Sequence, residues 1–282
     1  MTSPPLTLMT VHAHPDDESI GTGGIIAKYA REGIKTVLVH CTRGEMGDVQ
    51  DPAFVPPVPG MAMADIRMHE LKAAISLLGI RSTHYLGYRD SGMAGHPENQ
   101  NPAVFAQADV EEASLRLARI IREEKPHVVV TYDEYGVYGH PDHIMTNVVT
   151  TKSFFMAGNP EIRTADNLPP WSPKKLYYLA IPMERIRKIR TMEKDRDPEK
   201  LPPTSLVGTP EDEITTVIDV SDVLDVKFNA IFIHKSQIGP ASFFRKMSEE
   251  QIQVMFAREY FVCKHGCRAS DAKETDLFEG LR

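Results

Sequence analysis

Two hydrophobic periods alternate along the first half of the chain. Short apolar, β-branched runs predict strands at residues 6–11, 36–40, 83–86 and 127–132. Apolar residues at helical spacing predict helices at residues 20–31, 61–78, 110–124 and about 143–156. Strands that alternate with helices of this length indicate a parallel sheet covered on both faces. The predicted fold class is therefore α/β, a Rossmann-like three-layer α/β/α domain with a mostly parallel sheet.

The pattern changes after residue 157, where prolines interrupt the chain repeatedly. Strands are expected at residues 176–181 and 214–220, and a helix at 222–234. We therefore expect residues 1–157 to form the catalytic core, and residues 158–282 to form a smaller C-terminal extension that packs on the same domain. The charged segment 184–200 is predicted to be only a solvated helix face. The proline-rich segment 50–59 is predicted to be a loop over an active site.

Composition and charge exclude several classes of protein. The chain has 282 residues, of which 41% are hydrophobic and 25% charged, as in ordinary globular proteins. Its formal net charge of −7 offers no basic surface for nucleic acid. It contains neither an apolar stretch of ~18 residues nor the charged start of a secretory signal. We expect a cytoplasmic protein that binds neither nucleic acid nor membrane. The oligomeric state is left open, a homo-oligomer included.

Two further patterns are weak evidence for sites. The sparse cysteines Cys41, Cys263 and Cys267 suit a reducing compartment and are expected to be thiols. A metal site at residues 263–267 is disfavoured, because it offers three soft ligands where structural zinc takes four. A nucleotide site at the glycine run 21–24 is also disfavoured, because the third glycine of the dinucleotide fingerprint is missing.

The turns after the first and fourth predicted strands are rich in imidazoles and carboxylates. Open α/β sheets bind ligands beyond the carboxyl ends of their strands, so both turns face the expected site. Residues 12–18 read HAHPDDE, and residues 139–143 read GHPDH. Imidazole and carboxylate together suit a divalent transition metal, most simply zinc, and a catalytic zinc takes three protein ligands and one water. The predicted ligands are His14, Asp17 and His143.

Asp16 and His140 would then flank the metal. Asp16 is placed to act as a base toward water, and His140 to donate to a developing oxyanion. A single His-Pro-Asp turn is usually only a cap or a turn, because Asp and Pro are ordinary turn residues. Two copies, each directly after a strand, favour the metal site.

The two turns resemble the signatures of the PIG-L/LmbE-like family of zinc-dependent N-deacetylases. The likeness extends to residues 41–45, 67–79, 89–95, 131–133 and 274–280. The string RDSGMAG at residues 89–95 and the tail at 274–280 are similar to the mycothiol branch of this family. That branch includes N-acetylglucosaminyl-inositol deacetylases and mycothiol S-conjugate amidases.

The resemblance implies a role for each matching residue. His14, Asp17 and His143 bind zinc, and Asp16 is the general base. His140 acts as an electrostatic or acid partner, Asp142 orients it, and Tyr138 assists the oxyanion. The residues implied to hold a sugar-inositol substrate are Arg67 and Asp90, with a further polar contact from Glu45. In the alternative interpretation, Arg67 and Asp90 pair with each other as a surface ion bridge. The sequence leaves open whether His234 and Gln237 reach the site or cap a core face.

The implied function is hydrolysis of the N-acetyl amide of an amino sugar such as GlcNAc-inositol, which releases acetate and a free amine. The sequence does not discriminate zinc from iron(II) as the cofactor. Within the enzyme class, the alternatives are a mycothiol S-conjugate amidase and a deacetylase of another GlcNAc-containing metabolite. A metal-binding or sugar-binding protein without turnover is the alternative from another class. Asp16 argues against it, because binding alone needs no base.

Overall fold

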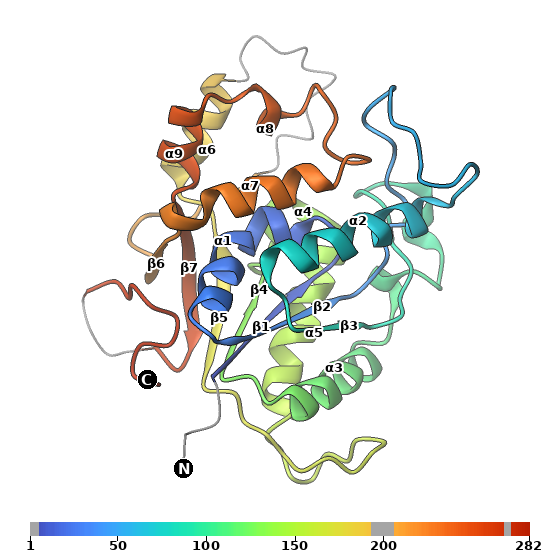
Figure 1. The fold of residues 1–282 in the computed structure, drawn as a ribbon. Helices are drawn as coiled ribbons and strands as arrows, with labels where there is room; N and C mark the ends of the chain where they lie inside the picture. The colour runs from blue at the N-terminus through green and yellow to red at the C-terminus, as the bar shows by residue number, and fades with distance from the viewer. Residues whose placement is uncertain (1–5, 193–205, 268–271) are drawn as a thin grey trace.

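A seven-stranded sheet runs through the protein in the order β3-β2-β1-β4-β5-β7-β6 (Figure 1). The computed structural model describes residues 6–192, 206–267 and 272–282. The strands are β1 (Thr7–His12), β2 (Lys35–His40), β3 (Ser82–Tyr85), β4 (Val128–Thr131), β5 (Lys175–Ala180), β6 (Thr216–Asp219) and β7 (Arg258–His265). Strands β3, β2, β1, β4 and β5 are parallel, whereas β7 is antiparallel to both β5 and β6. The prediction of a mostly parallel sheet is confirmed.

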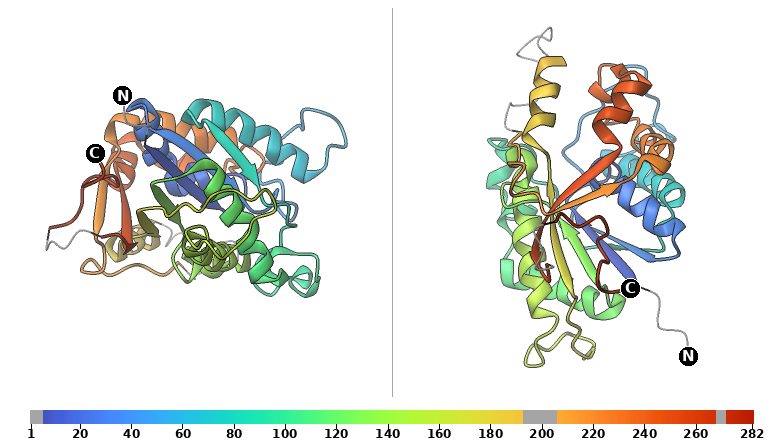
Figure 2. Two further views of the ribbon diagram at one scale, coloured as in Figure 1. Left: turned by 90° about the horizontal axis from the view of Figure 1, so that it is seen from below. Right: turned by 90° about the vertical axis from the view of Figure 1, so that its left-hand side faces the viewer.

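The helices form a layer on each face of this sheet. The longer helices are α1 (Asp17–Arg31), α2 (Met63–Leu78), α3 (Val110–Glu124), α5 (Pro141–Met156), α6 (Met183–Met192), α7 (Leu224–Ile233) and α9 (Glu249–Phe256). Helices α1, α2 and α7 cover one face, and α3 and α5 cover the other (Figure 2). Short helices are α4 (Gly136–Gly139) and α8 (Phe243–Lys246). This arrangement confirms the three-layer α/β class.

Strands β1 and β4 mark the point where the sheet reverses its direction of growth. From β1 the chain proceeds to β2 and β3 on one side, and then it crosses over to β4 and β5 on the other. In open α/β sheets, ligands bind in the crevice at such a point. Helices α1 and α5, which follow these two strands, begin at Asp17 and Pro141, earlier than the hydrophobic period predicts. Their first turns therefore lie beside this crevice.

Residues after 157 complete the sheet. Strand β7 inserts between β5 and β6. Three elements, β7, α8 and α9, were not predicted from the sequence. The division of the chain at residue 157 stays a prediction. Helix α6 corrects part of the prediction for residues 184–200: Ile186 is buried, and the Arg185 guanidinium lies over the rings of Phe256 and Tyr260. This helix is therefore not only a solvated face, and residues 193–200 lie outside the described residues.

Helix α1 is anchored by a buried ion pair from the C-terminal half. Lys227 Nζ lies 2.6 Å from Glu259 Oε1, and the Glu259 carboxylate also accepts the N–H groups of Gly24 and Ile25 at 2.8 and 2.9 Å. A side chain at Gly24 would clash, because its Cβ would lie 2.6 Å from Glu259 Oε1. Close packing therefore accounts for this glycine of the run 21–24 without any nucleotide.

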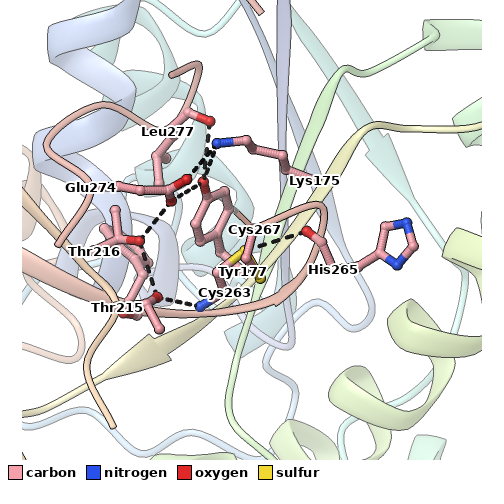
Figure 3. The surroundings of a disulfide bond; sticks show 10 residues. Lys175, Tyr177, Thr215, Thr216, Cys263, His265, Cys267, Glu274 and Leu277 are labelled. Carbon is pink, nitrogen blue, oxygen red and sulfur yellow. Dashed lines mark hydrogen bonds and ion pairs between the residues drawn. A yellow bond between two sulfur atoms is a disulfide. The ribbon is translucent and has the colours of Figure 1, made fainter. Parts of the chain in front are cut away.

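The expectation of three free thiols is wrong for two of the cysteines. Cys263 and Cys267 form a disulfide (Figure 3). Cys41 is free and buried. Gly266, at φ +72°, turns the chain after β7 so that the two Cα atoms lie 5.6 Å apart, within the usual range for a disulfide. Beside it, Lys175, Tyr177 and Glu274 form a buried polar cluster that ties the tail to the sheet. Spacing along the chain gave no sign of this turn.

Two other sequence predictions concern surfaces. Within residues 6–192, 206–267 and 272–282, no helix is both long and apolar enough to cross a membrane. The segment 50–59 begins with a hydrogen bond from Gln50 N–H to Ser236 O at 2.8 Å, and many of the following residues are exposed. Its role as a loop over an active site stays a prediction.

Candidate active site

The two His-Pro-Asp turns meet where β1 and β4 lie side by side. His14 follows β1, Asp17 is the first residue of α1, and His143 lies in the first turn of α5. Their candidate ligand atoms all lie within 4.8 Å of one another. Asp17 Oδ2 is 3.3 Å from His14 Nδ1 and 3.4 Å from His143 Nε2. The structure thus brings the three predicted ligands into one cluster.

The chemistry of this cluster fits a divalent metal ion. His14 and His143 are buried, and one carboxylate oxygen faces a nitrogen of each ring. Two imidazoles and a carboxylate are a common ligand set for a catalytic metal such as zinc, with further positions left for water. Burial alone would raise the pKa of Asp17, but the two histidines hold it well below its usual value. Asp17 is therefore a carboxylate, the form that binds a cation.

The other nitrogen of the His14 ring faces two more carboxylates. His14 Nε2 lies 3.2 Å from Asp142 Oδ2 and 3.5 Å from Asp90 Oδ1. A carboxylate behind a ligating histidine fixes the tautomer and the orientation of its ring. Asp142 is itself held by the backbone N–H of Ser91 at 2.9 Å and by the Ser91 hydroxyl. Ser91 lies in the RDSGMAG string but was not singled out as a site residue.

The role that the resemblance implies for Asp142, orienting His140, stays a prediction. In the described part of the chain, the hydrogen bonds of its carboxylate go to His14 and Ser91. Its link to His140 is instead a backbone one, because Asp142 N–H donates to His140 Nδ1 at 3.1 Å. With Nδ1 an acceptor, the proton of a neutral His140 is on Nε2. Burial lowers the pKa of His140 to about 2, helped by the charges of His14 and His143.

Tyr138 and Tyr132 border His143 from two sides. The Tyr138 hydroxyl lies 3.4 Å from His143 Nε2. The Tyr132 ring stacks on the His143 ring with centroids 4.1 Å apart, and its hydroxyl accepts the N–H of Ala13 at 2.9 Å. Tyr132 therefore links the two turns and fixes the plane of His143, a role that sequence reasoning did not assign to it.

Asp16 lies beside the cluster in an unusual backbone conformation. Its φ of +112° is rare for a residue with a side chain and costs about 1–3 kcal/mol. Asp16 Oδ2 lies 3.2 Å from Arg67 Nη2, which also donates to Pro15 O at 2.6 Å. Burial raises the pKa of Asp16 to about 6, against the opposing charge of Arg67. Such a carboxyl group exchanges a proton near neutral pH, as a general base must.

The predicted substrate residues lie around the same cluster: Arg67 and Asp90 are buried, and Glu45 is half-buried. Arg67 pairs with Asp16, and Asp90 with His14, so the alternative of a surface bridge between Arg67 and Asp90 is wrong. Asp90 also accepts the N–H groups of Met46 and Gly92. Glu45 accepts the N–H of Asp90 at 3.0 Å. Arg67, Asp90 and Glu45 thus lie together on the β2 and β3 side of the cluster.

His234 and Gln237 have different surroundings. His234 Nε2 lies 3.0 Å from Glu18 Oε1, and both side chains are buried. Gln237 instead donates to the carbonyl oxygen of Asp48 at 3.3 Å. His234 therefore reaches the turn that carries Asp16, whereas Gln237 contacts the loop after β2.

A cavity of about 320 Å³ adjoins the cluster on its β5 and β7 side. Asp17, Tyr138 and His143 line one end of it. Its other walls are largely apolar and include Leu179, Ile181, Phe243, Phe244 and Phe256. The sequence carried no signal for this cavity, because its walls come from segments far apart in the chain. The candidate metal site thus has polar side chains on one side and an apolar cavity on the other.

Fold and cluster together define an α/β protein with a candidate His/Asp metal site at the carboxyl edge of a parallel sheet. The family model described as GlcNAc-PI de-N-acetylase (PIG-L) matches residues 9–154. The 1D-myo-inositol 2-acetamido-2-deoxy-alpha-D-glucopyranoside deacetylase of Thermobifida fusca (strain YX) is 41% identical over 284 residues, 96% of this chain and 98% of that protein. The chain belongs to the PIG-L/LmbE family of N-deacetylases.

Solved structures share the fold at low sequence identity. The N,N'-diacetylchitobiose deacetylase from Pyrococcus horikoshii is 22% identical with a TM-score of 0.61, over 92% of this chain and 84% of that one. GalB, a 4-carboxy-2-hydroxymuconate hydratase from Pseudomonas putida KT2440, is 18% identical with a TM-score of 0.59, over 94% and 98%. Because a deacetylase and a hydratase share it, the fold does not define the reaction, and the site must.

Proposed function

We propose that this protein hydrolyses the N-acetyl amide of a GlcNAc-inositol-like sugar, releasing acetate and a free amine. The observation that carries the proposal is the cluster of buried His14 and His143 with half-buried Asp17, and with Asp16 beside it. The relative from Thermobifida fusca, named for deacetylation of this inositol glycoside, supports the choice of substrate because it aligns over nearly the whole chain. A protein that only binds metal or sugar would not need the strained Asp16.

His14, Asp17 and His143 would hold the metal, zinc or iron(II). When bound, the ion polarises the amide carbonyl and lowers the pKa of a coordinated water. Asp16 takes the proton of the attacking water, because its pKa is raised to about 6 by burial. The Nε2–H of His140 and the hydroxyl of Tyr138 donate to the carbonyl oxygen as its negative charge develops.

The departing nitrogen must receive a proton. His140 is neutral near pH 7, because its pKa is lowered to about 2 by burial and by neighbouring charges. We therefore assign the return of the proton to Asp16, which receives it from water in the first step. Arg67 holds Asp16 during both transfers, since its guanidinium lies 3.2 Å from the carboxylate.

The test is an assay of zinc-loaded, iron(II)-loaded and chelator-treated protein with GlcNAc-inositol, in which both acetate and free amine are measured. We expect equal amounts of the two products from metal-loaded protein and none after chelation. Calorimetry on the same samples gives sugar binding independently. Binding without product release would establish the alternative, a sugar-binding protein without turnover.

The apolar cavity favours a second candidate, an amidase that acts on mycothiol S-conjugates. If the sugar lies on the Arg67 and Asp90 side of the cluster, the acyl group of the amide would extend toward the cavity, which Tyr138 and Leu179 line. An acetyl group is small beside a cavity of about 320 Å³, whereas this space would accommodate a larger acyl group such as an S-substituted cysteinyl group. The candidates are separated by kcat/KM for an acetylated and a conjugate-bearing sugar in wild type and in Ile181→Trp, which narrows the cavity. If the protein is a conjugate amidase, Ile181→Trp should lower kcat/KM for the conjugate-bearing sugar much more than kcat/KM for the acetylated sugar.

Truncation of the proposed sugar contacts should raise KM. For Asp90→Ala we expect about a tenfold rise in KM, since hydrogen bonds to charged groups are worth about 1.5–3 kcal/mol. For Arg67→Ala we expect a fall in kcat as well, because Arg67 also holds Asp16. Arg89→Ala is the matched control, since Arg89 is exposed and pairs with Glu98. Wild-type kcat/KM in both Asp90→Ala and Arg67→Ala would remove these residues from the sugar site.

A further inference from the structure

Asp16 is the N-cap residue of α1, yet its carboxylate does not cap the helix. An N-cap Asp normally accepts an N–H group from the first turn of its helix. Here the side chain makes no such bond, and the carboxylate lies against Arg67 instead. The φ of +112° accompanies this arrangement, which leaves the carboxylate for chemistry rather than for capping. Something else must hold the turn in this conformation.

Glu18 contacts the backbone of Asp16 and can hold it in this conformation. Its Oε2 atom accepts the backbone N–H of Asp16 at 2.9 Å, so Glu18 holds the strained residue by its main chain, while Arg67 contacts its carboxylate. The other oxygen, Oε1, accepts the hydroxyl of Ser19 at 2.5 Å and lies 3.0 Å from His234 Nε2. Glu18 is only 1% exposed, and His234 is fully buried. An acidic residue that merely complemented a helix N-terminus would not need such burial.

His234 comes from the distant C-terminal part of the chain. It follows α7, which packs on α1, and it lies outside residues 9–154 that match the family model. A buried carboxylate is costly unless it is paired and hydrogen-bonded. The Glu18 carboxylate has such partners, because the Asp16 N–H donates to Oε2, the Ser19 hydroxyl donates to Oε1, and His234 Nε2 lies 3.0 Å from Oε1. Glu18 is therefore paired without any of the three candidate metal ligands.

We propose that Glu18 and His234 are positioning residues for Asp16: Glu18 fixes the left-handed backbone at Asp16, and His234 fixes Glu18. The inference rests on the proposed function, since it takes Asp16 as the base of the reaction. It gives α7 a part in catalysis although no residue of α7 lies in the metal cluster. Removal of His234 should leave the metal and the sugar contacts in place and misplace the base.

The test compares His234→Leu and His234→Gln with Ser236→Ala as the matched control. Gln can still donate to Glu18, whereas Leu cannot. Ser236 is buried two residues further on and bonds to Glu70, a pair that does not contact Asp16. For His234→Leu we expect a 10–100-fold loss of kcat, the usual effect of removing a supporting partner, with KM and zinc content within about twofold of wild type. His234→Gln should recover most of kcat.

A second measurement is independent of turnover. Hydrogen exchange at the Asp16 amide, in metal-free protein, should be faster in His234→Leu than in Ser236→Ala, because the acceptor of this N–H is no longer fixed. Wild-type kcat in His234→Leu, or an equal loss in Ser236→Ala, would overturn the inference. If His234→Leu does not fold, His234→Asn replaces it, since its shorter amide does not reach Glu18. An inactive wild type would instead contradict the proposed function and leave the exchange result to decide the inference.

Discussion

His143→Ala should lose both its bound metal and its hydrolytic activity. The variant removes one of the three clustered side chains, so the remaining pair, His14 and Asp17, holds a cation far less tightly. Loss of the ion removes several kcal/mol of transition-state stabilisation, on the order of 10³-fold or more in kcat/KM. Elemental analysis of the purified variant measures the metal, and release of the amine measures activity.

Two controls separate ligand loss from damage to the fold. His69→Ala removes an exposed histidine of α2 and should keep full metal content and activity. His143→Asn keeps a polar side chain in the stack on Tyr132, so its melting temperature should stay closer to that of wild type while its metal is lost. Full zinc stoichiometry in purified His143→Ala would show that the ligand assignment is wrong.

Asp16→Asn should keep the metal and lose turnover. Asn has almost the same shape as Asp and still contacts Arg67, but it accepts no proton from water. General-base catalysis contributes about 10²–10⁴-fold, so we expect kcat to fall by that factor with little change in KM. Zinc content and steady-state kinetics on one preparation test both parts.

Asp17→Ala is the comparison for this variant. Asp17 faces His14 and His143, whereas Asp16 faces Arg67, so the two neighbouring carboxylates should behave differently. Asp17→Ala should lose metal and activity together. If Asp16→Asn loses as much metal as Asp17→Ala, then Asp16 is a ligand and the base must be sought elsewhere.

Hydrophobic periodicity predicted the elements that have a clear apolar pattern of their own. Helix α3 has the predicted bounds, because its apolar stripe lies between the N-cap Asp109 and a proline at 126. Strand β7, with the sequence REYFVCKH, escaped prediction because charged and imidazole side chains occupy its two ends and leave only a short apolar run in the middle. The Cys263–Cys267 disulfide depends on the same strand and was missed with it.

The candidate site was also predicted only in part. The three residues of the candidate metal cluster were predicted because each lies in a short motif between a strand and the first turn of the next helix, at the edge where a parallel sheet gathers its ligands. The apolar cavity and the contact between Glu18 and His234 were not, because their members are brought together only by the packing of α7, α8 and α9 on the rest of the protein. Side-chain partners over two hundred residues apart leave no mark in one sequence.

Strand β4 limits how this protein can be dissected. All four of its residues, Val128–Thr131, are buried, and it is paired with β1 on one side and β5 on the other. A fragment that ended near residue 157 would contain both histidine motifs, yet it would expose β4 as an edge with unpaired backbone groups and apolar side chains. Such edges recruit other chains and promote aggregation. The same fragment would lack Glu259, whose carboxylate accepts N–H groups in the middle of α1. We therefore expect the motif-bearing half to be insoluble when expressed alone.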